Sequence, residues 1–304
     1  MRDVPGATTS PSTTAGAVHP VTTDLAPMPA NDRGAVSTAP VPLSEADRST
    51  LVSAVAALEG STLAGRLSSL AGKPLELLGH ALPAPARELI SSATESALKA
   101  ALRVALTTLP KAASGGGRSE RTHTALAAAS GALGGALGLV TLPIELPVST
   151  TLILRAIADI ARDEGEDLAL PETGLACLQV FALGSRTEAD DLASSGYFAV
   201  RSALAKSVTD AARLVAGRGL TDRSAPALVR FTAQVAARFG IVVSQKVAAG
   251  AVPVIGALGG AAVNAAFMEH FRTVARAHFA VRRLERAYGP ALVREVYDAI
   301  RAGS

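Results

Sequence analysis

The sequence predicts an all-α fold, with one multi-helix domain over residues 44–304 preceded by a disordered tail over residues 1–43. Apolar residues recur at helical spacing in long segments, and these segments end at Pro or Gly. Long runs of alternating apolar and polar residues, which are typical of half-buried strands, are missing. Because 49% of the residues are hydrophobic and only 3% are aromatic, we expect a core built mainly from Ala, Leu and Val.

The first 43 residues differ in composition from the rest of the chain. They hold seven of the 17 prolines, are rich in Thr and Ala, and contain no aromatic residue. Such a segment cannot bury enough apolar surface to offset the entropy lost on ordering, so we expect it to be disordered. The alternative is a docking peptide, for which Val18, Val21 and Leu25 would be the apolar anchors.

The ordered part is expected to begin at Ser44, a typical helix N-cap ahead of an apolar run that extends to Leu58. Prolines and glycines divide the remainder into further helical segments. We expect these at about 85–109, 119–142, 147–164, 171–184, 187–215, 222–248, 257–287 and 290–302.

Two segments stand out because each has 21 residues without a charge, Thr124–Ile144 and Val247–Phe267. Each contains the same six residues, Gly-Ala-Leu-Gly-Gly-Ala, at 131–136 and at 256–261, which suggests a repeated Gly-rich apolar helical unit. Their glycines recur at four-residue spacing, which lets two helix backbones approach closely. The predicted helix-packing residues are Gly131, Gly134, Gly135, Gly138, Gly256, Gly259 and Gly260.

The length of these segments matches the roughly 20 residues that cross a bilayer as a helix. Each has only seven large apolar residues, however, and glycine and proline do not favour insertion. Two interpretations therefore stay open: membrane insertion, or glycine-zippered core helices of a soluble protein.

The order and spacing of several motifs resemble the EcsC protein family of bacteria. Residues 131–147 read GALGGALGLVTLPIELP, and this motif leads into LRAIADIA at 154–161, EGED at 164–167 and CLQVFALG at 177–184. PVIGALGGA at 253–261, with Asn264 and Phe267, resembles the family's C-terminal block. The resemblance covers residues 50–290 and implies an acid at position 145, which Glu145 supplies. The family's namesake is encoded beside an ABC transporter, and the resemblance implies no established reaction.

Few residues are candidates for chemistry, and we take Glu145, Arg155 and Asp159 as weak catalytic candidates. Glu145 is expected just before a helix that starts at Pro147, where the helix dipole would stabilise its carboxylate; the alternative is a buried functional carboxylate. Arg155 and Asp159 lie on one face of an amphipathic helix and are most simply solvated or paired. We expect His278 and Cys177 to be buried, and His270, Asp190, Asp191 and Tyr197 have no evident chemical partner.

The segment 264–287 combines a basic stripe with aromatic residues. Arginines recur along it at helical spacing, with Phe279 among them, and such a face can rest on an anionic membrane surface. The alternative is an ordinary solvated face. The predicted membrane or partner contacts are Arg272, Arg276, Phe279, Arg283 and Arg286.

Together these features favour a non-enzymatic, membrane-associated protein that acts at the cytoplasmic membrane face, alongside a transport system. The expected partners are a membrane surface or membrane protein, a lipid-like ligand, or a second copy of the chain. The sequence lacks the known motifs of metal and nucleotide sites, so we expect no cofactor and no metal. Scarce aromatics argue against nucleic acid. A single Cys and no visible signal peptide favour a cytoplasmic location. The alternatives are a soluble enzyme or carrier with an apolar pocket, or a scaffold whose tail docks into an assembly.

Overall fold

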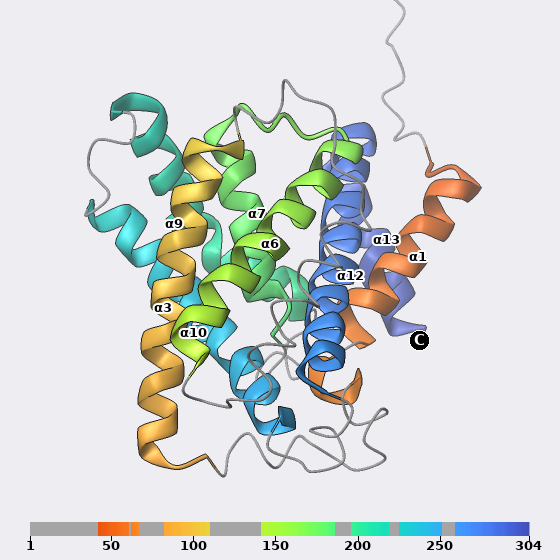
Figure 1. The fold of residues 1–304 in the computed structure, drawn as a ribbon. Helices are drawn as coiled ribbons and strands as arrows, with labels where there is room; N and C mark the ends of the chain where they lie inside the picture. Colours follow the sequence, from red (N-terminus) through yellow and green to blue (C-terminus); the bar gives the residue numbers. More distant parts are fainter. Residues whose placement is uncertain are drawn as a thin grey trace, which may run out of the picture. The chain divides into compact units, whose positions relative to one another are not determined.

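The computed structural model describes residues 42–60, 62–66, 82–109, 141–185, 196–218, 225–250 and 259–303. The chain divides into two units, Met1–Ala39 and Pro40–Ser304, and all described residues belong to the second. Within these ranges the regular secondary structure is helical, which confirms the all-α fold (Figure 1). The helices are α1 Glu45–Gly60, α3 Ala84–Thr107, α6 Leu142–Asp163, α7 Pro171–Leu183, α9 Gly196–Arg218, α10 Pro226–Gly250, α12 Gly259–Tyr288 and α13 Pro290–Ala302.

Several helix boundaries follow from capping residues that the sequence analysis singled out. The Ser44 hydroxyl accepts a hydrogen bond from the Asp47 backbone N–H at 3.1 Å, which confirms Ser44 as the first N-cap. Proline lies in the first turn of α3, α6, α7 and α13, where its missing N–H costs nothing. Between α12 and α13, Gly289 has a φ of +89°, a conformation that side chains disfavour.

The core is centred on α7, in which every residue from Thr173 to Leu183 is buried. This helix packs against α3, α6, α9, α10 and α12. In Figure 1, α3 and α6 run side by side with α7 behind them. Four phenylalanines join α7 to α10 and α12 in edge-to-face and tilted contacts, with ring centroids 4.9 to 6.0 Å apart: Phe181, Phe239, Phe267 and Phe271.

One predicted helix start is wrong. The helix that was expected to begin at Pro147 begins at Leu142, so Pro147 lies inside it. Pro147 has no N–H to bond the carbonyl of Pro143 and its ring crowds that carbonyl, but Pro143 is exposed, so water can bind the carbonyl instead. Glu145 is therefore in the first turn of α6 rather than ahead of the helix.

Other predictions lie outside the described residues. These are the disorder of residues 1–41 and the helix packing of Gly131, Gly134, Gly135, Gly138 and Gly256. Gly259 and Gly260 are the first two residues of α12. The predicted glycine packing therefore stays a prediction.

Candidate functional site

The structure does not place the five predicted contact residues of α12 on one exposed stripe. Phe279 is fully buried and Arg272 is only 7% exposed, so their assignment to a surface contact is wrong. The periodicity is correct, since Arg272, Phe279, Arg283 and Arg286 share a helix face. That face is only partly covered, because Arg283 and Arg286 pair with acids of α1 and of the connection after α6 while their side chains remain 39% and 43% exposed. Arg276 is half-exposed and lies 3.1 Å from Glu269.

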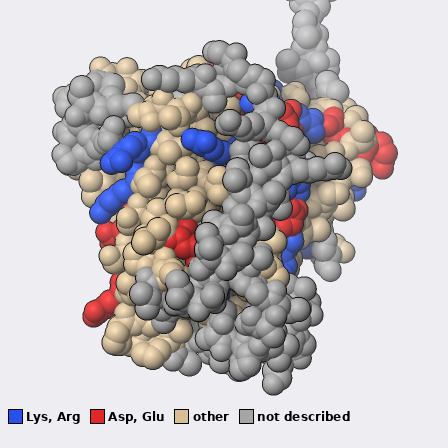
Figure 2. Space-filling view, in the orientation of Figure 1, with Lys and Arg blue, Asp and Glu red and all other residues tan. Residues whose placement is uncertain are grey.

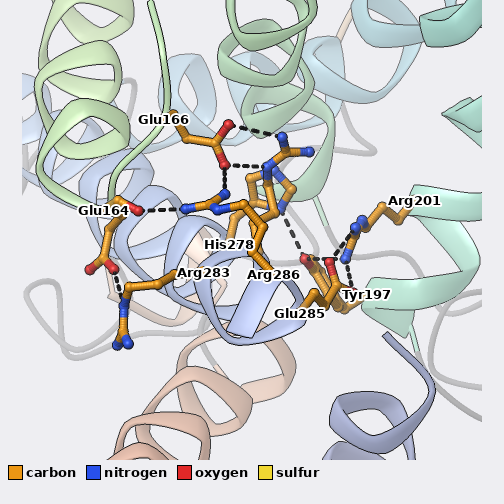
Figure 3. Close-up of polar contacts among 9 residues, drawn as sticks. Glu164, Glu166, Tyr197, Arg201, His278, Arg283, Glu285 and Arg286 are labelled. Atoms are coloured by element: carbon orange, nitrogen blue, oxygen red, sulfur yellow. Dashed lines mark hydrogen bonds and ion pairs between the residues drawn. The ribbon is translucent and has the colours of Figure 1, made fainter. Parts of the chain in front are cut away.

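The arginines near the end of α12 bind acids from other parts of the chain (Figure 3). Arg282 donates two hydrogen bonds, of 2.8 and 3.0 Å, to the carboxylate of Glu166, which also pairs with Arg286. Arg283 donates to Glu164 at 2.9 Å and to Asp47 of α1 at 3.1 Å. Three arginines therefore meet three acids. We call Asp47, Glu164, Glu166, Arg282, Arg283 and Arg286 the arginine network.

The connection between α6 and α7 positions two acids of the arginine network. Gly165 separates Glu164 from Glu166 and has a φ of +81°, which turns the chain directly after α6. Glu166 is almost fully buried. Burial acts to raise the pKa of Glu166, but the hydrogen bonds and charges of Arg282 and Arg286 outweigh it and hold the pKa below its usual value. The carboxylate therefore stays ionised and keeps both arginines engaged.

Beside the arginine network, α9 and α12 share a buried polar cluster that the sequence analysis missed. The Tyr197 hydroxyl lies 2.9 Å from Nδ1 of His278, and Arg201 donates to both oxygens of Glu285 at 2.8 and 2.7 Å (Figure 3). Burial, with the charges of Arg201 and Arg282, lowers the pKa of His278 well below its usual value. His278 is thus a neutral core histidine, as expected.

The described residues around this cluster leave little room for a substrate. The cavity beside Tyr197 has a volume of about 10 Å³, enough for one water molecule. Burial raises the pKa of Tyr197 to about 12, so its hydroxyl stays protonated at neutral pH. The arrangement ties α9 to α12.

At the opposite end of α12, Glu145 forms a buried ion pair with Lys246. Lys246 Nζ lies 2.7 Å from Glu145 Oε1, and the two side chains are only 7% and 13% exposed. The ammonium group also lies 5.0 Å from the ring centroid of Phe267, a cation–π contact. Burial lowers the pKa of Lys246, and the charge of Glu145 opposes this only in part. Sequence reasoning found Glu145 but not its partner.

Exposed apolar side chains flank Glu145 in the sequence. Ile144 and Val148, on either side of Glu145 in α6, are 76% and 47% exposed. The first turn of α6, the last turn of α10 and the first turns of α12 lie toward the same end of the bundle, in the lower part of Figure 1. We call Ile144, Glu145, Val148, Lys246 and Phe267 the apolar end, and this is the candidate functional site.

The three weak catalytic candidates are not brought together. Glu145, Arg155 and Asp159 all lie on α6, and a rise of about 1.5 Å per residue places Arg155 about 15 Å from Glu145 along the helix. Asp159 is about one turn further on, 2.9 Å from Arg162. Within the described part of the chain, these three side chains do not form a common reaction centre.

His270 and Cys177 are buried, whereas Asp190 and Asp191 lie outside the described residues. His270 Nε2 lies 2.7 Å from the carbonyl of Gly184, and burial lowers the pKa of His270 to about 4. Cys177 is fully buried, as expected, and burial raises the pKa of its thiol. In the part of the chain that the structure describes, no three His, Cys, Asp or Glu side chains are grouped as metal ligands.

The surface adds two observations. Figure 2 shows one face on which Lys and Arg side chains are scattered among uncharged atoms rather than gathered into one basic area. Among the described helices, Pro226–Ala249 in α10 is long and apolar enough to cross a membrane, and only a third of its most apolar stretch is buried. Core helices of soluble proteins can pass the same test.

The chain matches the model of a known protein family. The model of the EcsC protein family matches residues 55–284, a range that contains the apolar end and most of the arginine network. No curated protein and no solved structure matches the chain.

Proposed function

We propose that this chain, which belongs to the EcsC protein family, is a non-enzymatic protein that associates with the cytoplasmic face of a membrane through the apolar end. A single observation carries the proposal. Glu145 directly follows the uncharged segment 124–144, Lys246 directly precedes the uncharged segment 247–267, and these two residues pair with each other.

The pairing neutralises the charges that adjoin the two uncharged segments within the bundle. An isolated charge is costly to bury, so Glu145 and Lys246 are each tolerated because the other is present. The ion pair also holds the end of α10 against the start of α6, so residues 142–144 of one segment and 247–250 of the other join the bundle at the same end. An end without net charge suits contact with lipid.

The exposed side chains at this end support the same function. Ile144 and Val148 are among the few large apolar residues that the described structure leaves exposed. They project from the start of α6, next to the uncharged segment. Exposure of these apolar side chains to water is unfavourable, whereas contact with a lipid surface would remove both side chains from water. Membrane contact gives their exposure a physical reason.

Attachment through the apolar end differs from attachment through the basic stripe of α12. The arginine network balances its own charges, so it offers little attraction to anionic lipid. We therefore infer that binding depends on apolar contact. Such binding is insensitive to salt, because ions screen only charge interactions.

Vesicle flotation with purified full-length protein tests this function. We expect the wild type to float with vesicles of neutral lipid, and Val148→Asp to reduce the floating fraction at least tenfold, because it places a charge at the apolar end. Val52→Asp is the matched control, since Val52 lies on the surface of α1 and is 44% exposed, against 47% for Val148. No flotation of the wild type, or equal loss in both variants, would contradict the proposal.

A second measurement separates lipid from protein partners. Vesicles that contain no protein suffice if the apolar end binds lipid directly. Flotation only with vesicles made from native membranes would instead indicate an integral membrane protein as the partner. The circular dichroism spectrum and melting temperature of Val148→Asp should match those of the wild type, because the substituted side chain is exposed.

A further inference from the structure

A groove runs between α3 and α10, away from the residues of the apolar end. Its volume is about 390 Å³, and it is lined by Ser91 of α3 and by Ala233, Ala237, Gly240 and Ser244 of α10, with Arg87 and Glu95 of α3 at its ends. The residues of α10 recur at spacings of three and four, so they lie on one helix face. This face is uncharged and is built from small side chains.

The small residues make room for another helix. A Cβ atom added at Gly240 would have no neighbour within 4 Å, so none of the described residues occupies the space above this glycine. Ala233 and Ala237 lie along the same face and are exposed. Helices pack closely where small residues let their backbones approach.

The charged residues of the groove have opposite signs and lie at its two ends. Arg87 and Glu95 are eight residues apart on α3, about 12 Å along the helix, and both are exposed. Ser91 lies midway between them on the same face. A two-fold axis through the groove near Ser91 would therefore exchange a positive end with a negative end.

We infer that this groove is the contact surface for a second copy of the chain, arranged about such a two-fold axis. In this arrangement Arg87 of each copy faces Glu95 of the other, and the small-residue faces of α10 meet at the centre. The surface is thus complementary to itself, which is the requirement for a symmetric dimer. Charge pairs of this kind select the partner and its orientation.

Two further observations favour a protein over a lipid tail as the occupant. The groove has few large apolar side chains, Ile90 and Ile241, whereas ligand pockets are lined predominantly by such residues. Glu95 already lies 3.3 Å from Lys99 within the protomer, but both side chains are more than half exposed. Such exposed pairs contribute little, so Glu95 is free to pair with Arg87 of a second copy.

Charge reversal provides a specific test, with the mass of full-length protein measured by light scattering in a non-denaturing detergent. We expect a dimer for the wild type. Arg87→Glu alone and Glu95→Arg alone should each be monomeric, because each places like charges opposite each other. An equimolar mixture of the two variants should restore the dimer, since every pair across the axis is then of opposite sign.

Gly240→Leu tests the centre of the groove. It should also yield a monomer, while Gly217→Leu on α9 is the matched control and should remain dimeric, because neither glycine has a neighbour at its Cβ position. A monomeric wild type, dimers of either charge variant alone, or a mixture that fails to pair would each overturn the inference. Lipid bound to monomeric wild type in native mass spectrometry would make lipid the occupant. Mass and vesicle flotation are measured separately, so dimer formation and membrane binding can fail independently.

Discussion

The two ends of α12 both carry ion pairs, but these are built differently. Near its start, Lys246 has Glu145 as its single ionic partner among the described residues, and both side chains are nearly buried. Near its end, the carboxylate of Glu166 has two arginine partners that remain 27% and 43% exposed. The first pair has little access to water if it breaks, because its side chains are only 7% and 13% exposed, whereas the arginines of the second can turn into solvent.

This difference separates two roles for charge in the same helix. At the end of α12, several partly exposed charges hold α1 and the α6–α7 connection in place, so the loss of one contact leaves others. At the start, a single buried ion pair allows two uncharged segments to join the bundle without an unpaired charge. The apolar end should therefore be the more fragile of the two.

The largest expected effect is the loss of one partner from the buried pair. Lys246→Met leaves the carboxylate of Glu145 buried without a counter-ion, and we expect the free energy of unfolding to fall by about 3–5 kcal/mol. Chemical denaturation of the full-length protein measures this change. The double variant Lys246→Met, Glu145→Leu should recover most of the loss, because it removes both charges. A double variant as unstable as the single one would contradict this account of the apolar end.

Removing a carboxylate from the arginine network should cost less. Glu166→Gln keeps the shape of the side chain but loses the charge that binds Arg282 and Arg286. We expect a loss of about 1–3 kcal/mol, the range for hydrogen bonds to charged groups, because both arginines can reach water. Asp210→Asn is a control, since its partner Lys206 is 82% exposed and the pair should contribute at most about 0.5 kcal/mol. A Glu166→Gln loss as large as that of Lys246→Met would erase the contrast between the two ends.

The pH dependence of unfolding tests the contribution of Glu166 in a second way. The pKa of Glu166 is lower in the folded protein than its reference value of 4.5, so the unfolded chain binds the proton more readily. The stabilisation from Glu166 is complete above pH 4.5 and is lost as the pH falls through the folded-state pKa. Unfolding curves at several pH values should therefore show that Glu166→Gln and the wild type converge below pH 4.5. A constant difference across that range would show that the carboxylate contributes by packing alone.

More of the fold than of the candidate site could be predicted from the sequence. Gly289 and the prolines that begin α7 and α13 mark helix boundaries by local chemistry, which the sequence contains in full. The partners of the charged residues depend on tertiary packing. Periodicity places Arg283 and Arg286 on one face of α12, but only the packing of α12 against α1 and the α6–α7 connection shows that acids cover this face. Likewise, no local pattern joins Glu145 to Lys246, about 100 residues away.

The smallest expected effect concerns the outward charge of α12. Arg276 is the predicted contact residue that lies outside the arginine network and is not buried, and its neighbour Glu269 is equally exposed. Arg276→Gln should therefore change the free energy of unfolding by less than about 0.5 kcal/mol, as at other surface positions. It should also leave flotation with neutral and anionic vesicles unchanged, since binding through the apolar end does not use this charge. If Arg276→Gln instead removed a preference for anionic lipid that falls with added salt, the basic face of α12 would be the membrane contact. The roles assigned to the two ends of the helix would then have to be reversed. Added salt identifies such binding, because attraction to an anionic surface is screened within about 10 Å at 0.1 M salt.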